Sequence, residues 1–331
     1  EAITKLNLKL SDKKGTGAII CSSETIAKII QDQLKLHGIN YSAEKSSRDL
    51  GVLYTAAKFS PASFLSKRFK ATKPRIIKTV SLAKTCRKAR VLFSGSCFAA
   101  ATWGHEACGL PPRVFLALEQ AAANATGITN GRCRFSALVL GYGPTGTPRH
   151  KIVFQLLSSW YNTFKQMVQL NLTNNLRTAW VFACKHFQNF KTTPPPAQIR
   201  GIMSNVIIML LELKWSPHSF NCWEDPLGEF WVLDDFSISS HNLSKHVASF
   251  FIKRDLERAR HHFNGQGIER GIDWEATLKT VKAHKTPEQY PFKCALETII
   301  SGATWPLTRI AISNPINTLC TRCGTAPEDS L

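Results

Sequence analysis

Two cysteines near the end of the chain have the spacing of a metal-binding pair. Cys320 and Cys323 stand in the segment NTLCTRCGTAPEDSL. A structural zinc ion is held by four Cys or His side chains, which usually come as two such pairs within some tens of residues. No second pair with this spacing follows in the sequence. We therefore expect half of a zinc site here, with the other two ligands beyond the given sequence.

The other cysteines do not form the pattern of a disulfide-rich protein. They are scattered singly, and several stand in apolar runs, as Cys97, Cys133 and Cys184 do. Such a distribution is typical of reduced thiols in the core of an intracellular protein. We therefore expect an intracellular location.

A second chemical feature is a long run of basic residues without acids. Between positions 67 and 90 there are ten lysines and arginines and no aspartate or glutamate. A solvated helix normally carries both signs of charge, because oppositely charged side chains four residues apart stabilise it. Apolar residues interleave with the basic ones, so one helix face can pack while the opposite face follows a phosphate backbone. The expected phosphate-binding residues are Lys67, Arg68, Lys70, Lys73, Arg75, Lys78, Lys84, Arg87, Lys88 and Arg90. The alternative is a basic surface without a specific partner.

The composition of the whole chain agrees with a polyanionic partner. The 331 residues include 42 lysines and arginines against 23 aspartates and glutamates, which gives a formal charge of +19. Such an excess favours nucleic acid as the partner. The most apolar segment, GIMSNVIIMLLELKW, contains Asn205, Glu212 and Lys214. It therefore predicts a core helix, and we expect no membrane-spanning segment.

Other motifs give weaker signals. The segment GYGPTG at 141–146 has the glycine spacing of a dinucleotide-binding turn, but Pro144 interrupts it and no acid lies between Glu119 and Glu212 to hold a ribose, so we expect an ordinary loop. His105 and Glu106 lack the second histidine of a zinc hydrolase motif, and local packing or a helix cap is expected for His105. We expect His261 and His262 on a solvated helical face, and Asp234–Asp235 in an ordinary turn.

Periodicity and turn residues predict a mainly helical chain with a small β part at its start. In the first 57 residues, Ser23 is expected to cap a helix that Gly38 closes, and the strand INYS is expected to pair with DLGVLYTA in a hairpin. A Trp-rich stretch at 215–236 predicts a second hairpin. Helices are expected within 60–130, 150–190, 197–215, 243–262 and 289–301.

Several segments together resemble the reverse transcriptases of non-LTR retrotransposons. The segment LNLKLSDKKGTGAIICSS is similar to polymerase motif D, and SSRDLGVLYTAAK is similar to the primer-grip hairpin of motif E. Further on, WGHEACGL and SGATWPLTRIAISNPINTLCTRCGTAPED resemble the thumb and the zinc-knuckle tail of these proteins. The order and spacing of these segments carry the resemblance across nearly the whole chain.

The resemblance implies an α+β fold, mainly α, with four parts. Residues 1–58 correspond to the end of the palm with motifs D and E, and residues 59–143 to a basic helical thumb. Residues 144–290 form a helical extension that includes the Trp-rich turn segment. Residues 291–331 form a helix and a truncated CxxC zinc knuckle.

The resemblance also implies roles for residues in the first part. Lys14 matches the motif D lysine, which is proposed to act as a general acid towards the leaving pyrophosphate. Lys13 is the neighbouring alternative, because Gly15 replaces the usual Thr or Ser. Leu50, Gly51 and Val52 match the primer grip.

The function implied for the parent protein is RNA-directed DNA synthesis. In this family the aspartates that hold Mg²⁺ lie upstream of motif D, so we expect this chain to be a fragment that is inactive alone and binds nucleic acid. The implied partners are an RNA template and a DNA primer or target, with dNTP as the parent enzyme's substrate, in the nucleus at the site of integration. The alternatives are a non-enzymatic basic helical nucleic-acid-binding protein, or a fragment of a maturase or RNA-templated RNA polymerase.

Overall fold

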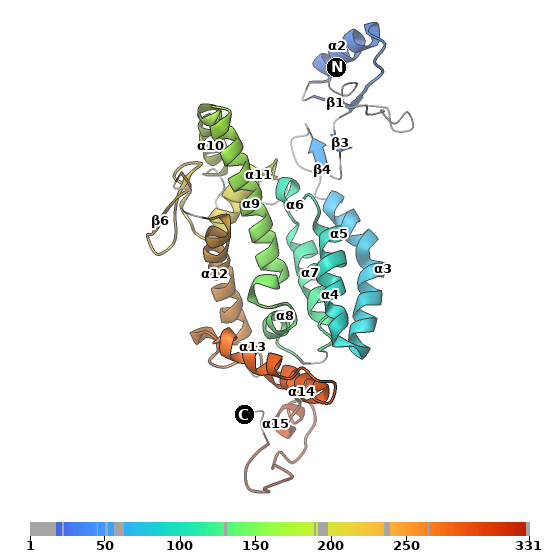
Figure 1. Cartoon of the computed structure of the whole chain (residues 1–331), viewed down its shortest axis with the longest axis vertical. Coiled ribbons are helices and arrows are strands. Elements are labelled where there is room, and N and C mark those ends of the chain that lie inside the picture. Colours follow the sequence, from blue (N-terminus) through green and yellow to red (C-terminus); the bar gives the residue numbers. More distant parts are fainter. Residues whose placement is uncertain are drawn as a thin grey trace.

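A computed structural model describes most of the chain and is mainly helical, with three two-stranded sheets in the described part (Figure 1). The described residues are 18–21, 23–44, 46–49, 52–55, 63–128, 131–188, 190, 198–234, 239–263 and 265–328. The expected mainly helical fold with small β elements is confirmed at this level. The correspondence to a polymerase palm and thumb stays a prediction.

The first described elements form a small β–α–β unit at one end of the molecule (Figure 1). Strand β1 (Ala18–Ile20) runs parallel to β2 (Ser42–Glu44), and helix α2 (Glu24–Leu36) makes the crossover. The Ser23 hydroxyl accepts a hydrogen bond from the Ile26 amide at 3.4 Å, and Gly38 follows the helix with φ +74°. Both helix signals that the sequence provides are therefore confirmed.

The following hairpin differs in register from the expected one. Strand β3 (Ser46–Asp49) pairs antiparallel with β4 (Val52–Thr55), so that two residues connect the strands. The expectation that residues 39–42 pair with 49–56 is wrong. Residue 42 instead begins β2, which pairs with β1 because α2 provides the long connection that parallel strands need.

The first helical group contains the basic segment. Its longest member, α3 (Ser63–Thr85), is followed by a 3₁₀ turn at Arg87–Ala89 and a π-helical turn at Phe93–Cys97. The shorter helices of this group are α4 (Arg90–Leu92), α5 (Phe98–Thr102), α6 (His105–Cys108), α7 (Pro112–Asn124) and α8 (Arg134–Tyr142). Helices α3, α5, α7 and α8 and the π-helical turn share one core, which includes Phe69, Ile76, Phe93, Phe98 and Leu118.

The second helical group packs around tryptophans. It comprises α9 (Pro148–Gln169), α10 (Thr173–Gln188), α11 (Ile202–Glu212), α12 (Ser240–Ala259) and the hairpin of β5 (Cys222–Glu224) and β6 (Phe230–Val232). The Trp180 ring centroid lies 5.3 Å from that of Trp160 and 6.4 Å from that of Trp223. The expected Trp-rich hairpin is confirmed, and its Trp223 packs in this core.

Three helices end the chain, and the first two of them cross the ends of both groups (Figure 1). They are α13 (Trp274–Ala283), α14 (Tyr290–Ile300) and α15 (Leu307–Ile310). The buried Arg309 guanidinium holds this segment in place, since it donates hydrogen bonds to the carbonyl oxygens of Gly302, Thr304 and Gly131 at 2.7–2.8 Å. Among the described residues, no helix combines the length and the apolar character that crossing a membrane requires.

Candidate nucleic-acid interface

Helix α3 has one buried face and one cationic face. Leu65, Phe69, Ile76 and Ala83 recur at helical spacing and are buried. At 100° per residue, Lys67, Lys70 and Lys78 lie on the side opposite these residues, and all three are exposed. The helix contains no acidic residue.

Other basic residues extend this exposed surface along the helix. Lys73 and Lys84 flank the central lysines, and Lys88 is exposed on the 3₁₀ turn that follows. Within the described part of the chain, none of these lysines forms a salt bridge. We call Lys67, Lys70, Lys73, Lys78, Lys84 and Lys88 the lysine face.

Two arginines of the basic segment stabilise the local fold as well. The Arg68 guanidinium lies 4.9 Å from the Phe64 ring centroid and donates a hydrogen bond to the Trp103 carbonyl. The exposed Arg75 donates one to the Ser96 hydroxyl of the π-helical turn at 3.2 Å. Arg75 thus joins α3 to the turn that precedes α5, and Arg68 joins it to the residue that follows α5.

Arg87 and Arg90 do not belong to the lysine face. Arg87 Nη1 lies 2.9 Å from Glu297 Oε2, and Arg90 Nη1 lies 3.0 Å from Glu297 Oε1. The Glu297 side chain is 1% exposed, so both guanidinium groups turn inward towards α14. The sequence placed these arginines among the phosphate-binding residues because nothing local indicated a partner so far along the chain.

The expected catalytic lysine and most of the primer grip cannot be placed. Lys14 and its alternative Lys13 lie outside the described residues, as do Leu50 and Gly51. Val52 is the first residue of β4 and pairs with Asp49. The roles that the resemblance implies for these residues stay predictions.

Cys320 and Cys323 lie in a compact turn. The Cys320 amide donates to the Ala326 carbonyl at 2.7 Å, and the Gly324 amide donates to the Cys320 carbonyl at 2.8 Å. The Arg322 amide lies 3.4 Å from Cys320 Sγ. Hydrogen bonds from the amide and hydroxyl of Thr325, followed by those from Ala326 and Cys320, lower the pKa of Cys323 to about 6. The turn therefore favours a thiolate, the form that binds metals.

No third ligand joins this pair in the described part of the chain. There, three Cys, His or carboxylate groups come close enough together to hold a metal ion at a different place, formed by Asp225, Glu229 and His246. The half zinc site expected at Cys320 and Cys323, and binding of Zn²⁺ there, therefore stay predictions.

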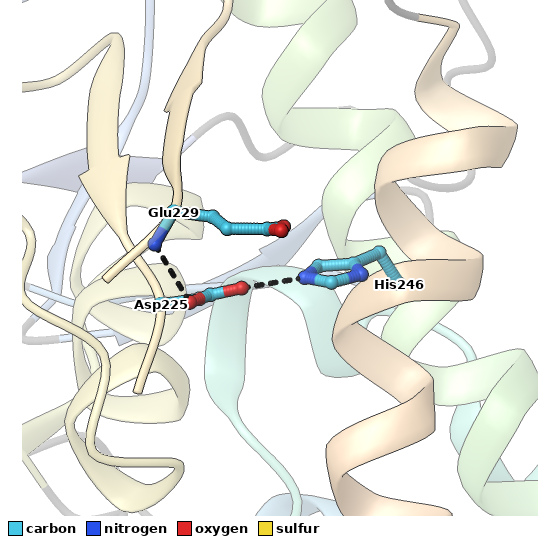
Figure 2. A group of neighbouring side chains, drawn as sticks. All are labelled: Asp225, Glu229 and His246. Atoms are coloured by element: carbon cyan, nitrogen blue, oxygen red, sulfur yellow. Dashed lines mark hydrogen bonds and ion pairs between the residues drawn. The ribbon is translucent and has the colours of Figure 1, made fainter. Parts of the chain in front are cut away.

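The Asp225 group joins the Trp-rich hairpin to α12, as Figure 2 shows. Asp225 Oδ1 accepts hydrogen bonds from the amides of Leu227 and Glu229 at 2.8 and 3.1 Å, and Oδ2 lies 2.9 Å from His246 Nε2. The His246 ring stacks on Trp231 with centroids 4.3 Å apart. Burial acts to raise the pKa of Asp225, but the bonds from His246 and the two amides outweigh it and lower the pKa.

These contacts favour a structural role for Asp225 over metal binding. Both carboxylate oxygens already accept hydrogen bonds, so a cation would have to compete with an amide or with His246. Sequence reasoning predicted the hairpin but not this contact. The segment EDPLGE contains the Asp-Pro-x-Gly signal of the turn, yet nothing in it points to His246.

The partly buried Arg149 of α9 lies between α7, α9 and α12. The Arg149 guanidinium stands 4.3 Å from the Phe115 centroid and 5.0 Å from the Phe251 centroid. Its Nε lies 3.1 Å from Asp255 Oδ2 and 3.7 Å from Glu119 Oε1. Burial raises the pKa of Glu119, against the opposing effect of Arg149. Arg149, Glu119 and Asp255 line a pocket of about 390 Å³, and the contacts of Arg149 make it a structural link among the three helices.

Of the histidines singled out in the sequence, His105 and His262 contact the fold, while His261 is exposed as expected. His105 is buried, with Nδ1 3.0 Å from the Thr102 carbonyl oxygen, as expected for local packing. His262 lies beyond the end of α12, and its Nε2 is 2.6 Å from the Gly131 carbonyl oxygen. The expectation of a solvated helical face is therefore wrong for His262. Residues 144–146 form a 3₁₀ turn between two helices, and Asp234 accepts a hydrogen bond from Asn221.

Comparisons of the chain with protein-family models, with curated proteins and with solved structures find no match.

Proposed function

We propose that this chain binds nucleic acid through the lysine face of α3. The observation that supports this most directly is the combination of exposed lysines and the absence of acids along the whole helix. Without acidic neighbours on the helix, the lysines keep their full positive field, and a polyanion gains by releasing its condensed counterions.

The dimensions of α3 suit a nucleic-acid backbone. Its 23 residues span about 35 Å at 1.5 Å per residue, which is close to one helical turn of duplex DNA. Lysine side chains offer flexible ammonium groups and no planar fork for a base edge. Contacts should therefore be made to phosphates, with little sequence preference.

The finer proposal is that this surface serves an RNA-directed DNA polymerase of a non-LTR retrotransposon. It rests on the resemblance at the motif D, motif E and knuckle segments. In that setting the chain would hold an RNA template and a DNA primer in the nucleus, and the parent's Mg²⁺ and dNTP would bind at residues upstream. The Cys320–Cys323 turn would supply two of four zinc ligands.

Charge reversal at three central lysines tests the binding surface. The variant K67E/K70E/K78E should bind a labelled duplex more weakly at every salt concentration. Its log–log salt slope should fall by roughly 0.9 for each phosphate that the variant no longer neutralises. The control K185E/K245E/K253E makes the same change in net charge at exposed lysines of α10 and α12. Equal weakening in both variants would contradict the proposed surface, because it would reflect net charge alone.

A further inference from the structure

A hollow of about 480 Å³ lies where the lysine face ends. The 3₁₀ turn after α3 forms one side of it, and the loop before α14 with the first turns of that helix forms the other. In Figure 1, α14 lies across the end of the first helical group at which α3 terminates. Side chains that are 203 to 211 positions apart in the sequence thus meet at one surface.

The hollow has a strong excess of positive charge. The described residues that line it include Arg87, Lys88, Arg90, Lys285 and Lys293, and among them Glu297 is the one carboxylate. Glu297 neutralises only one of the two arginines that it contacts. The three lysines have no salt-bridge partner in the described part of the chain. The other acid of this region, Glu288, stands on the loop before α14 and does not line the hollow.

The two arginines are held in place before any ligand arrives. Arg87 also donates hydrogen bonds to the Cys294 carbonyl at 2.8 Å and to the Thr298 hydroxyl at 3.0 Å, and its amide donates to the Tyr290 hydroxyl. A fixed cation loses less side-chain entropy on binding than a free one. The two arginines are therefore held rigidly. Of the lysines, Lys285 comes from the loop before α14 and Lys293 from α14 itself.

The N-terminus of α14 also favours the binding of an anion in the hollow. The N-cap residue Gln289 makes no side-chain cap to the helix, and its Oε1 instead accepts from the Lys285 and Thr286 amides. The positive end of an 11-residue helix thus borders the same hollow. Fixed guanidinium groups, mobile ammonium groups and a helix start together suit a phosphate group.

We propose that this hollow binds a backbone phosphate of the nucleic-acid strand that lies on the lysine face. The strand leaves α3 at Lys84, passes Lys88 and reaches Lys285 and Lys293. This inference rests on the proposed function and adds a second contact region from another part of the chain. A phosphate of a free nucleotide shares the same chemistry, and continuity with the lysine face favours the strand.

The test compares K285E/K293E with K279E/K282E in the full chain. The control lysines are exposed on α13, next to the hollow but outside its lining. We expect K285E/K293E to bind a long labelled duplex at least tenfold more weakly than K279E/K282E, with a salt slope lower by roughly 0.9, the change that one lost phosphate contact produces. Circular dichroism and urea unfolding would establish that both variants are folded.

Comparing duplex binding by K67E/K70E/K78E and by K285E/K293E distinguishes a failure of this inference from a failure of the proposed function. Weaker binding in K67E/K70E/K78E with unchanged binding in K285E/K293E would overturn the inference alone. Unchanged binding in both would overturn the proposed function. A third arm titrates the wild-type chain with inorganic phosphate and with a mononucleotide. Micromolar binding of the mononucleotide that K285E/K293E abolishes, with duplex binding unaltered, would assign the hollow to a free ligand and also overturn the inference.

Discussion

Arg90 directs both of its terminal nitrogens at a single oxygen of Glu297, at 3.0 and 3.1 Å. Arg87 occupies the other oxygen at 2.9 Å, so one buried carboxylate holds two guanidinium groups. These bonds join the end of the basic segment to α14. The described cations of the basic segment therefore differ in their surroundings: its lysines face solvent, and its last two arginines are bound to α14.

Removing the charge of Glu297 should destabilise the protein. In Glu297→Gln, two partly buried guanidinium groups lose their counterion, and breaking a buried pair in this way costs about 3–5 kcal/mol. Urea unfolding would measure the change in stability. Glu288→Gln is the control, because Glu288 is exposed and should change stability by less than about 0.5 kcal/mol. Similar stability of the two variants would show that the Arg87–Glu297–Arg90 contact contributes little.

The stability of the Arg149 region should depend on pH through Glu119. Burial raises the pKa of Glu119 above its ordinary value of 4.5. The folded state then binds this proton more tightly than the unfolded state, so this group's contribution to stability rises as pH falls through the raised pKa. Unfolding free energies measured from pH 7 down to the ordinary value of 4.5 would show this rise, and Glu119→Gln should remove it. An identical pH profile in the variant would contradict the assignment.

Asp225 should contribute stability with the opposite pH dependence. Its pKa lies below the ordinary value of 3.8, so its contribution is present above about pH 4 and is lost as pH falls through the lower folded value. Asp225→Asn should lose about 1.5–3 kcal/mol at pH 7, as expected for hydrogen bonds to a charged group, and should show less acid dependence. Thermal unfolding from pH 7 to 2.5 measures both effects.

Glu229→Gln separates the structural role of this group from metal binding. Glu229 is exposed, and its amide rather than its carboxylate contacts Asp225. The variant should therefore unfold like the wild type, and added Zn²⁺ or Mn²⁺ should leave both melting temperatures unchanged. A metal-dependent rise in the wild type that Glu229→Gln abolishes would assign the group to a cation.

Cys323 should be the most reactive thiol of the described chain. Its pKa of about 6 makes it largely thiolate at pH 7, and it is one of two exposed cysteines there, with Cys86. Alkylation by iodoacetamide, followed by peptide mass spectrometry, should modify Cys323 several-fold faster than Cys86. The Cys323 rate should fall as pH drops below 6. Thr325→Val should slow it at pH 7, because the hydroxyl contributes to the lower pKa. Equal rates at the two cysteines would contradict the role of the turn.

Local features of the fold could be predicted because their causes are local. Ser23 and Gly38 mark the ends of α2, and the tryptophans of residues 215–236 mark the hairpin, because capping and turn chemistry act over a few residues. The exposed lysines of α3 follow from helical periodicity alone.

The remaining features depend on partners distant in the sequence. Pairing of residues 42–44 with 18–20 required knowledge of the crossover, and the sequence alone favoured a local hairpin. Nothing around Arg90 indicates Glu297, and nothing around Asp225 indicates His246. The charge pattern therefore identified the segment that carries the candidate interface but could not tell which of its cations are committed to the fold.

The separation of 207 residues between Arg90 and Glu297 has a consequence during synthesis. At about 5–20 residues per second, a ribosome adds this length in roughly 10–40 s. For that time the nascent chain presents Arg87 and Arg90 without their counterion. Long-range contacts also form late in folding, because closing a large loop costs entropy before any contact repays it. On the ribosome, Arg87 and Arg90 therefore face the surrounding RNA without their carboxylate partner, until Glu297 leaves the exit tunnel and α14 docks.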